Sequence, residues 1–206
     1  MSTILVVTAS PRGDRSVSRS LTTAFIDLWR QRHPGDRILL RDVGHHPVPH
    51  VTEAWMVGAF APMDAQTPES KEAIAVSDSL VEEFLSADRY VFGVPMHNFN
   101  VPSTFKAYID QIVRPGKTFG VGPRGYEGLV TGRKGLFITA SGGAYTPGSA
   151  AAALNFQEPY LRTIFGFIGL TDLQFVTADN LNQGADAARQ SKERAENALR
   201  ELAAAW

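Results

Sequence analysis

The chain alternates short β-branched runs with stretches whose apolar residues recur at helical spacing, and it does so five times. The run from Ile4 to Thr8 has the composition of a strand buried on both faces, and the apolar residues from Leu21 to Trp29 then share one helical face. Neighbouring parallel strands need a crossover long enough to hold a helix. The alternation therefore predicts an α/β protein in which a five-stranded parallel sheet carries helices on both faces.

The remaining elements follow the same rule. Further strands are predicted at 38–40, 90–94, 135–139 and 173–177, and further helices at 69–87, 105–112, 158–167 and 185–204. Residues 44–68 contain four prolines and predict a long irregular connection, with a short apolar helix that packs on its own core or on a partner subunit. With 206 residues and 44% hydrophobic content, the chain is expected to form a single domain over 1–206.

The composition excludes several classes of functional site and partner. The chain has no cysteine, which excludes disulfides, thiolate catalysis and cysteine-based zinc sites. A formal net charge of -1 gives no overall attraction to nucleic acid or to an anionic membrane. No apolar run approaches the roughly 20 residues of a membrane span, and the first residues do not resemble a signal peptide. We expect a cytoplasmic protein that binds neither nucleic acid nor membrane.

Ligands of parallel α/β sheets bind beyond the carboxyl ends of the strands, so the loops that follow the strands are the places to inspect. The first of them carries Ser10, Ser16, Val17 and Ser18 immediately before a helix. Serine hydroxyls, free amides at a helix start and the neighbouring arginines 12, 15 and 19 would suit a phosphate monoester. A serine-capped surface turn has the same residues, so this loop alone leaves both interpretations open.

The first loop lacks both G-x-G-x-x-G and G-x-x-x-x-G-K-[ST], which disfavours a dinucleotide-type Rossmann site and a P-loop. The loop after the third strand holds Met96, His97, Asn98 and Phe99 between two prolines. Such a loop could lay Met96 and Phe99 against a flat ring while Asn98 bonds its edge. A proline-rigidified connection whose Met and Phe belong to the core is the alternative.

The loop after the fourth strand contains Ala140, Ser141, Gly142, Gly143 and then Tyr145. Paired glycines let backbone N–H groups approach a ligand closely, although a plain Gly-Gly turn is also common. The pattern is not G-x-S-x-G, so a hydrolase nucleophile elbow is not indicated.

Four segments carry a resemblance that runs along nearly the whole chain: PMHNFNVPSTFKAYIDQIVRPGKTF (95–119), GLVTGRKG (128–135), SGGAY (141–145) and FGFIGLTDLQFV (165–176). Together with the serine loop, they resemble the FMN-dependent NADH-azoreductase family, whose members have also been labelled acyl-carrier-protein phosphodiesterases. The resemblance implies a flavodoxin-like three-layer fold. It also implies an FMN-dependent reductase that takes electrons from NADH or NADPH and passes them to quinone, azo or nitro acceptors with ping-pong kinetics.

Carried over to this sequence, the resemblance assigns the FMN phosphate to Ser10 and to residues 16–18, which are Ser16, Val17 and Ser18. It assigns the flavin ring to two loops, namely Met96, His97, Asn98 and Phe99, and Ala140, Ser141, Gly142 and Gly143. His97 stands where relatives often have tyrosine. No side chain is required as a nucleophile, and Tyr145 is the candidate hydrogen-bond or proton donor to the acceptor.

The same family resemblance implies a homodimer in which the partner subunit completes each pocket. Phe60, Phe119 and Tyr126 are then candidates for the substrate pocket, with coverage of their own core as the alternative. His45, His46 and His50 could suggest a metal, but few carboxylates accompany them, and we predict no metal site.

Two other function classes remain. A flavodoxin-like electron carrier without its own substrate is disfavoured because carriers tend to be strongly acidic, unlike this chain. A phosphoester hydrolase is disfavoured because the sequence offers neither a set of metal ligands nor a thiolate to carry out that reaction.

Overall fold

The computed structural model describes residues 1–62, 65–123 and 125–206, and its centre is a parallel sheet. The strand order is β2-β1-β3-β6-β7, and every neighbouring pair is parallel. These strands are β1 (Thr3–Thr8), β2 (Arg37–Asp42), β3 (Arg89–Pro95), β6 (Lys134–Ala140) and β7 (Asp172–Ala178). The five-stranded parallel sheet predicted from the sequence is confirmed.

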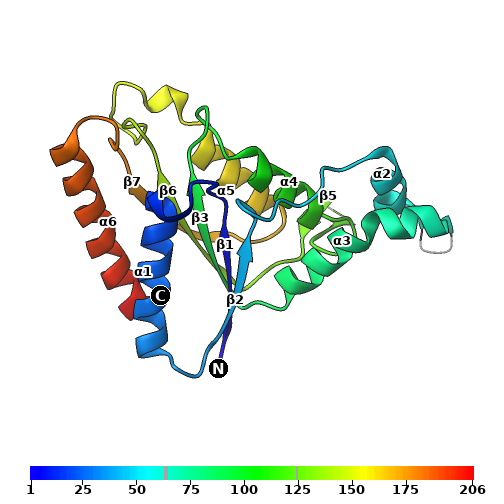
Figure 1. Cartoon of the computed structure of the whole chain (residues 1–206). Helices are drawn as coiled ribbons and strands as arrows, with labels where there is room; N and C mark the ends of the chain where they lie inside the picture. Colours follow the sequence, from blue (N-terminus) through cyan, green and yellow to red (C-terminus); the bar gives the residue numbers. More distant parts are fainter. Residues whose placement is uncertain (63–64, 124) are drawn as a thin grey trace.

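Helices cover both faces of the sheet (Figure 1). On one face lie α1 (Val17–Arg32) and α6 (Ala185–Ala205), and on the other lie α3 (Pro68–Leu85), α4 (Ser103–Ile112) and α5 (Gln157–Phe167). The short helices are α2 (Glu53–Phe60) and the 3₁₀ turns η1 (Gly13–Arg15) and η3 (Ala152–Leu154). Every predicted strand and long helix is present, and the expected short helix in the proline-rich connection is α2.

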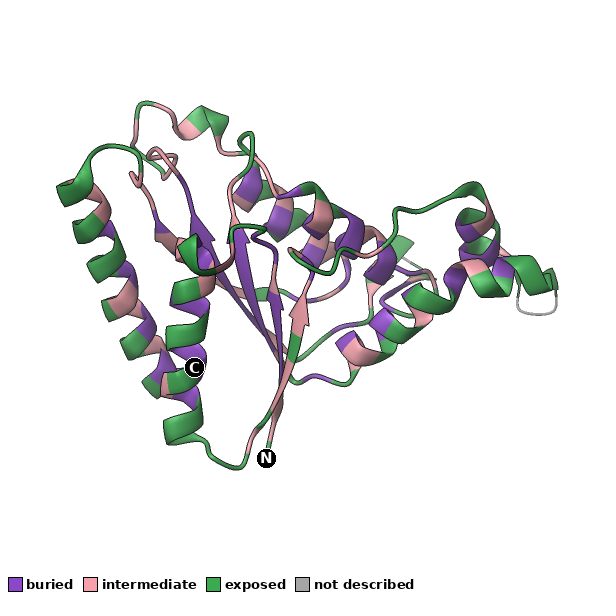
Figure 2. Ribbon diagram, in the orientation of Figure 1, coloured by how far each residue is buried: buried purple, intermediate pink, exposed green. Residues whose placement is uncertain are grey.

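Each inner strand alternates its side chains between two apolar cores, which explains why its sequence is apolar throughout. Ile4 and Val6 pack with Phe25 and Trp29 of α1, whereas the side chains on the opposite face join the core beneath α3, α4 and α5. Buried residues concentrate in these two layers (Figure 2). β2 is an edge strand, and its Leu40 is exposed.

Helix ends follow the local sequence. Ser16, Thr52 and Thr67 cap α1, α2 and α3 through their side-chain oxygens, and Pro68 occupies the first turn of α3, where its missing N–H costs nothing. α1 ends just before Pro34-Gly35.

A polar network fixes α2 to the rest of the fold. The indole N–H of Trp55 donates to Gln111 Oε1 over 2.8 Å, and the amide of Gln111 donates to the Pro49 carbonyl, also over 2.8 Å. Gly58 lies so close to α3 that a β-carbon would stand 2.5 Å from the Ser70 carbonyl oxygen. As a result, α2 is docked on α3 and α4 while projecting from the main body (Figure 1).

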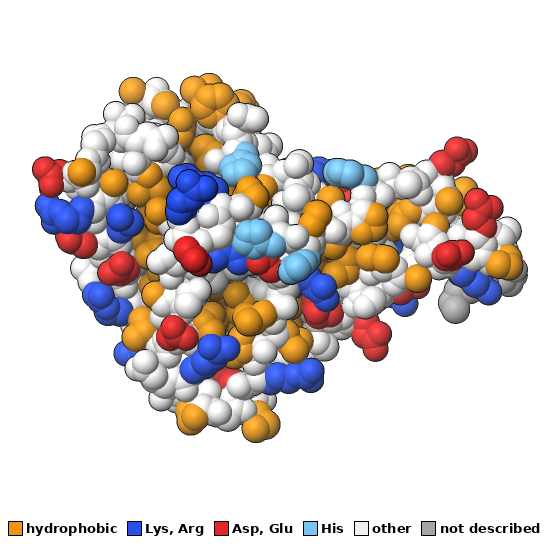
Figure 3. Space-filling model, in the orientation of Figure 1, with side chains coloured by type: hydrophobic (Ala, Val, Ile, Leu, Met, Phe, Trp, Pro, Cys, Tyr) orange, Lys and Arg blue, Asp and Glu red, His pale blue; other side chains and the backbone are white. Residues whose placement is uncertain are grey.

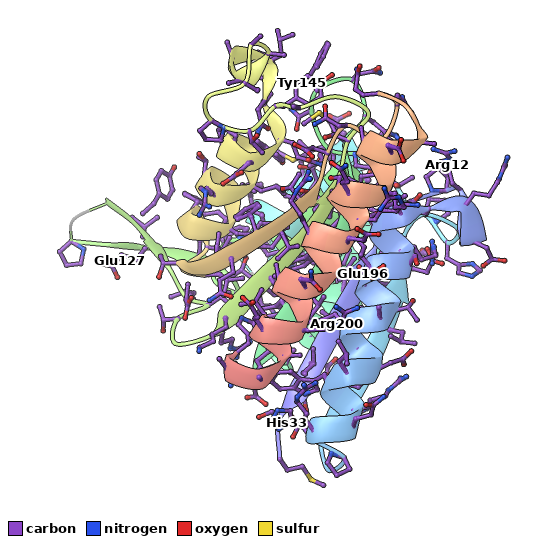
Figure 4. All side chains as sticks on the ribbon, turned by 90° about the vertical axis from the view of Figure 1, so that its left-hand side faces the viewer. Arg12, His33, Glu127, Tyr145, Glu196 and Arg200 are labelled. Carbon is purple, nitrogen blue, oxygen red and sulfur yellow. The ribbon has the colours of Figure 1, made fainter. Side chains whose placement is uncertain are left out.

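The sequence analysis did not predict the antiparallel hairpin of β4 (Phe119–Gly122) and β5 (Gly125–Gly128). Its strands are short and glycine-rich, so they lack the β-branched run that identifies the other strands. Glu127 lies on this hairpin, which extends from the side of the main body (Figure 4). Among the described residues, none of the helices combines the length and the hydropathy that a bilayer span requires. On the face shown in Figure 3, positive and negative side chains are interspersed.

Candidate functional site

The serine loop lies where the strand order reverses. The chain runs from β1 outward to β2 and then returns to β3 on the other side of β1, so the carboxyl ends of β1 and β3 border the crevice that ligands use in such sheets. The side chains of Ser10, Ser16 and Ser18 are 1%, 4% and 0% exposed. Ser16 and Ser18 are therefore buried at the start of α1, and Ser10 is buried just after β1.

These hydroxyls are partly satisfied by one another and by the backbone. Ser16 Oγ accepts from the Arg19 N–H over 3.3 Å and lies 3.2 Å from Ser18 Oγ. Ser10 Oγ accepts from the Arg12 N–H over 3.3 Å. The first N–H groups of α1 have no acceptor within the helix and carry its partial positive charge. This arrangement favours the binding of an anion.

A cavity of about 180 Å³ opens over this loop. The loops after β1, β3, β6 and β7 line it with Ser10, Arg12, Ser16, Val17, Ser18, Pro95, Met96, His97, Ala140, Ser141, Gly142, Leu181 and Asn182. The structure thus brings together nine of the residues predicted to hold the cofactor, from all three of the loops that the sequence singled out.

Asn98 and Phe99 are exposed beside this cavity in a tight turn. His97 and Asn100 exchange two backbone hydrogen bonds of 2.8 and 3.0 Å across the turn. The central residues have φ values of 48° and 67°, a left-handed conformation that is unusual for an aromatic residue. The Phe99 ring meets the Tyr145 ring edge to face, with centroids 5.8 Å apart.

The glycine loop is fastened to the loop after β7. The N–H groups of Leu181 and Asn182 donate to the carbonyls of Ser141 and Gly142 over 3.2 and 3.0 Å. A β-carbon on Gly142 would stand 2.6 Å from Asn182 Nδ2, so a larger residue here would displace the Asn182 side chain. Gly143 does not line the cavity, although its carbonyl accepts from Ser141 Oγ over 2.8 Å.

Tyr145 lines a neighbouring hollow of about 20 Å³, together with Met96, Ser141, Gln157 and other polar residues. Met96 and Ser141 also line the larger cavity, so the hollow beside Tyr145 adjoins that cavity. Tyr145 and Arg12 lie toward one end of the sheet, and His33 lies at the other (Figure 4).

The sequence analysis missed Leu181 and Asn182. They follow β7, which is adjacent to β6, and their position after a parallel strand was the signal that could have identified them. It had considered only the loops after the first, third and fourth strands.

The three arginines of the serine loop have different surroundings. Arg12 lines the cavity, whereas Arg15 is exposed outside it. Arg19 turns to Asp42, with Nη–Oδ distances of 2.8 and 3.0 Å. Partial burial disfavours a charged Asp42, but hydrogen bonds from Arg19 and His45 outweigh it and hold the pKa of Asp42 well below its usual range. The charge of Arg19 is thus largely matched by that of Asp42.

Phe60, Phe119 and Tyr126 lie away from this cavity within the described chain. Phe119 is buried against Tyr126 and Phe167, with ring centroids 5.9 and 4.9 Å away. Tyr126 and Phe60 are 71% and 59% exposed, on the hairpin and on α2. One chain by itself therefore does not bring these three side chains to the serine loop.

The histidines of the 44–50 segment gather no metal ligands. His45 Nδ1 lies 2.9 Å from Asp42 Oδ2. Among residues 1–62, 65–123 and 125–206, there is no group of three or more His, Cys, Asp or Glu side chains that could share an ion.

Comparison with known proteins assigns this arrangement to a family. The model of the flavodoxin-like fold family matches residues 2–203, which is nearly the whole chain. The chain belongs to the flavodoxin-like family.

Relatives within the flavodoxin-like family are similar over their full length. An FMN-dependent NADH:quinone oxidoreductase of Nostoc punctiforme is 58% identical over 206 residues and covers 100% of both chains. The crystal structure of an azoreductase from Bacillus anthracis superposes with a TM-score of 0.92 at 31% identity, again over 100% of both chains. A second Bacillus anthracis structure, an FMN-dependent NADH-azoreductase in complex with FMN, has a TM-score of 0.86 at 28% identity and covers 98% of this chain and 100% of its own.

Proposed function

We propose that this protein is an FMN-dependent NADH oxidoreductase that reduces quinones and azo compounds. The observation that carries this proposal is the 58% identity, over the whole chain, to an FMN-dependent NADH:quinone oxidoreductase. The similarity to azoreductase structures supports the azo acceptors. A cytoplasmic location accords with this proposal, because NADH is a donor found inside cells.

The residues of the cavity fit FMN. Buried hydroxyls and free helix amides at Ser10, Ser16, Val17 and Ser18 would hold the terminal phosphate. The loop of Met96, His97, Asn98 and Phe99 offers apolar faces and an amide for the flavin ring. The loop of Ala140, Ser141, Gly142 and Gly143 would border another edge of the ring, and Gly142 there makes room for Asn182, which also lines the cavity. Nine of these residues line one cavity, which supports these roles, and Asn98, Phe99 and Gly143 lie in the same loops beside it.

When bound, FMN would supply the redox chemistry, which is the transfer of two electrons from NADH to the acceptor. The protein's own residues would hold and orient the flavin and its substrates and shield them from water. The Phe99–Tyr145 pair forms an aromatic corner beside the cavity, and the Tyr145 hydroxyl can donate a hydrogen bond to an acceptor. Since one cavity serves both substrates, donor and acceptor enter in turn, which predicts parallel lines in double-reciprocal plots.

A homodimer would complete the site. Met56, Val57 and Phe60 leave an apolar side of α2 in solvent, and Tyr126 and Val121 do the same on the hairpin. A second copy of the chain that covers these surfaces could bring Phe60, Phe119 and Tyr126 to its partner's acceptor pocket. Sedimentation of the FMN-loaded protein tests the dimer directly, and loss of dimer in Phe60→Ser would support this contact.

The decisive experiment for the activity is anaerobic. Purified protein loaded with FMN should lose its yellow colour on addition of NADH and regain it when a quinone or azo dye is added. Steady turnover with NADH as the only donor separates a reductase from an electron carrier, and a parallel series with NADPH establishes the donor preference. Protein that takes up no FMN would refute the proposal.

A further inference from the structure

The carbonyl of Ser10 is held by groups that lie behind the cavity wall. Arg19 Nη2 donates to the Ser10 carbonyl oxygen over 2.8 Å, and Nη1 donates to Thr8 Oγ1 over 3.1 Å. The same two nitrogens bond both carboxylate oxygens of Asp42. Because a guanidinium is rigid and planar, fixing it on Asp42 also fixes the donor that reaches Ser10.

Asp42 is itself anchored at the end of β2. Its Oδ1 accepts from the N–H groups of Gly44 and His45, each over 3.1 Å, and His45 Nδ1 lies 2.9 Å from its Oδ2. These bonds connect the edge strand to the start of α1 through one ionised carboxylate, whose pKa is held low by Arg19 and His45 in spite of partial burial.

Gly44 closes the space behind Ser10. A β-carbon on Gly44 would stand 2.3 Å from the Ser10 carbonyl oxygen and 2.6 Å from its carbonyl carbon. Both neighbours are backbone atoms, so no side-chain rotation could relieve the contact. Glycine at position 44 therefore allows the two backbone segments to approach this closely, and a larger residue there would displace Ser10.

On its other side, Ser10 forms part of the cavity wall, and its hydroxyl accepts from the Arg12 N–H. Arg19 does not line that cavity. We propose that Arg19, Asp42 and Gly44 form a rear bracket that positions Ser10 for the phosphate of FMN, and that Arg19 is a positioning residue and not a phosphate ligand. This inference rests on the proposed FMN function.

The effect of Asp42→Asn distinguishes the bracket from direct electrostatics. If Arg19 acted only through its charge, removal of the neighbouring carboxylate would free that charge, reduce repulsion and tighten FMN binding. The positioning role predicts the opposite change, which is weaker FMN binding. Loss of charge-assisted hydrogen bonds that hold Ser10 should weaken FMN binding about tenfold in Asp42→Asn and in Arg19→Gln.

The experiment titrates apo-protein with FMN and with riboflavin, which lacks the phosphate, for the wild type, both single variants and the double variant. Arg15→Gln is the matched control, because it removes a positive charge from the same loop outside the cavity. We expect both single variants to bind FMN more weakly than the wild type and to bind riboflavin almost unchanged. The double variant should bind FMN with about the same affinity as the single variant that binds it more weakly. Arg15→Gln should bind FMN like the wild type.

Arg19→Lys keeps the charge but cannot hold Asp42 and Ser10 with one planar group, so it should also bind FMN more weakly. Unchanged or tighter FMN binding in Asp42→Asn, or wild-type affinity in Arg19→Lys, would overturn the bracket. Circular dichroism identifies any variant that does not fold, and Arg19→Lys, as the mildest change, then decides the outcome. Wild-type protein that binds no FMN would instead refute the proposed function.

Discussion

The paired hydroxyls of Ser16 and Ser18 allow the phosphate site to be tested apart from the fold. Ser16 caps α1, and replacing such a cap by alanine costs about 1 kcal/mol of stability, whereas glycine costs only a few tenths. Ser16 Oγ and Ser18 Oγ lie 3.2 Å apart. Removing only one would leave the other without its neighbouring hydroxyl, so the variant removes both. The double variant Ser16→Gly/Ser18→Ala therefore removes both hydroxyls, including the one that caps α1, and the loss of the cap costs only about a few tenths of a kcal/mol.

We expect this variant to retain its thermal stability and to bind FMN more weakly. Each lost hydroxyl bond is worth about 1 kcal/mol, and about 2 kcal/mol corresponds to roughly a 30-fold rise in Kd. Flavin fluorescence during titration of the apo-protein measures the change. Riboflavin affinity should stay near the wild-type value, because the hydroxyls are assigned to the phosphate.

Ser20→Ala is the matched control, since Ser20 is exposed on the same helix. It should change neither affinity. An unchanged Kd for FMN in the double variant would show that the serines only cap a turn. Equal losses for FMN and riboflavin would place the serines beside the ring and refute the phosphate assignment.

Three further predictions concern the fold. Gly58→Ala places a β-carbon 2.5 Å from the Ser70 carbonyl oxygen, and chemical denaturation should show a loss of about 1–3 kcal/mol from overpacking. Phe92→Ala empties a fully buried site between sheet and helices, and the same measurement should show a loss of about 3–5 kcal/mol. The pKa of Asp42 is lower in the folded state than its ordinary value of about 3.9, so its contribution is present above that pH and is lost as the pH falls below it. Urea unfolding at pH 7, 5 and 3 should therefore show a steeper acid loss for the wild type than for Asp42→Asn, and parallel profiles would contradict the role of the Arg19 pair.

The sheet could be predicted from the sequence because local composition determines it. A strand buried on both faces needs an uninterrupted apolar run, and the chain contains such runs at the positions of β1, β3 and β6. β4 and β5 could not be predicted in this way. Their residues include several glycines, and the hairpin is defined by its pairing and by the packing of Phe119 on Phe167.

For the site, the sequence indicated three loops because parallel strands end at a common edge. It did not indicate which arginine faces the cavity. Arg12 and Arg19 are equally basic in sequence, and only the contact of Arg19 with Asp42, 23 residues away along the chain, distinguishes them. Asn182 similarly reaches the cavity through its bonds to the glycine loop, a tertiary contact that local spacing does not encode.

The left-handed turn at Asn98 and Phe99 has a consequence for how this protein can change. Glycine adopts such φ values at no steric cost, so the fold alone would favour glycine over phenylalanine at position 99. Its aromatic ring is 40% exposed and contributes little to the core. Selection for heat tolerance alone would therefore remove the ring beside the cavity, and selection for ligand binding would keep it. Position 99 is a place where the two selective pressures oppose each other.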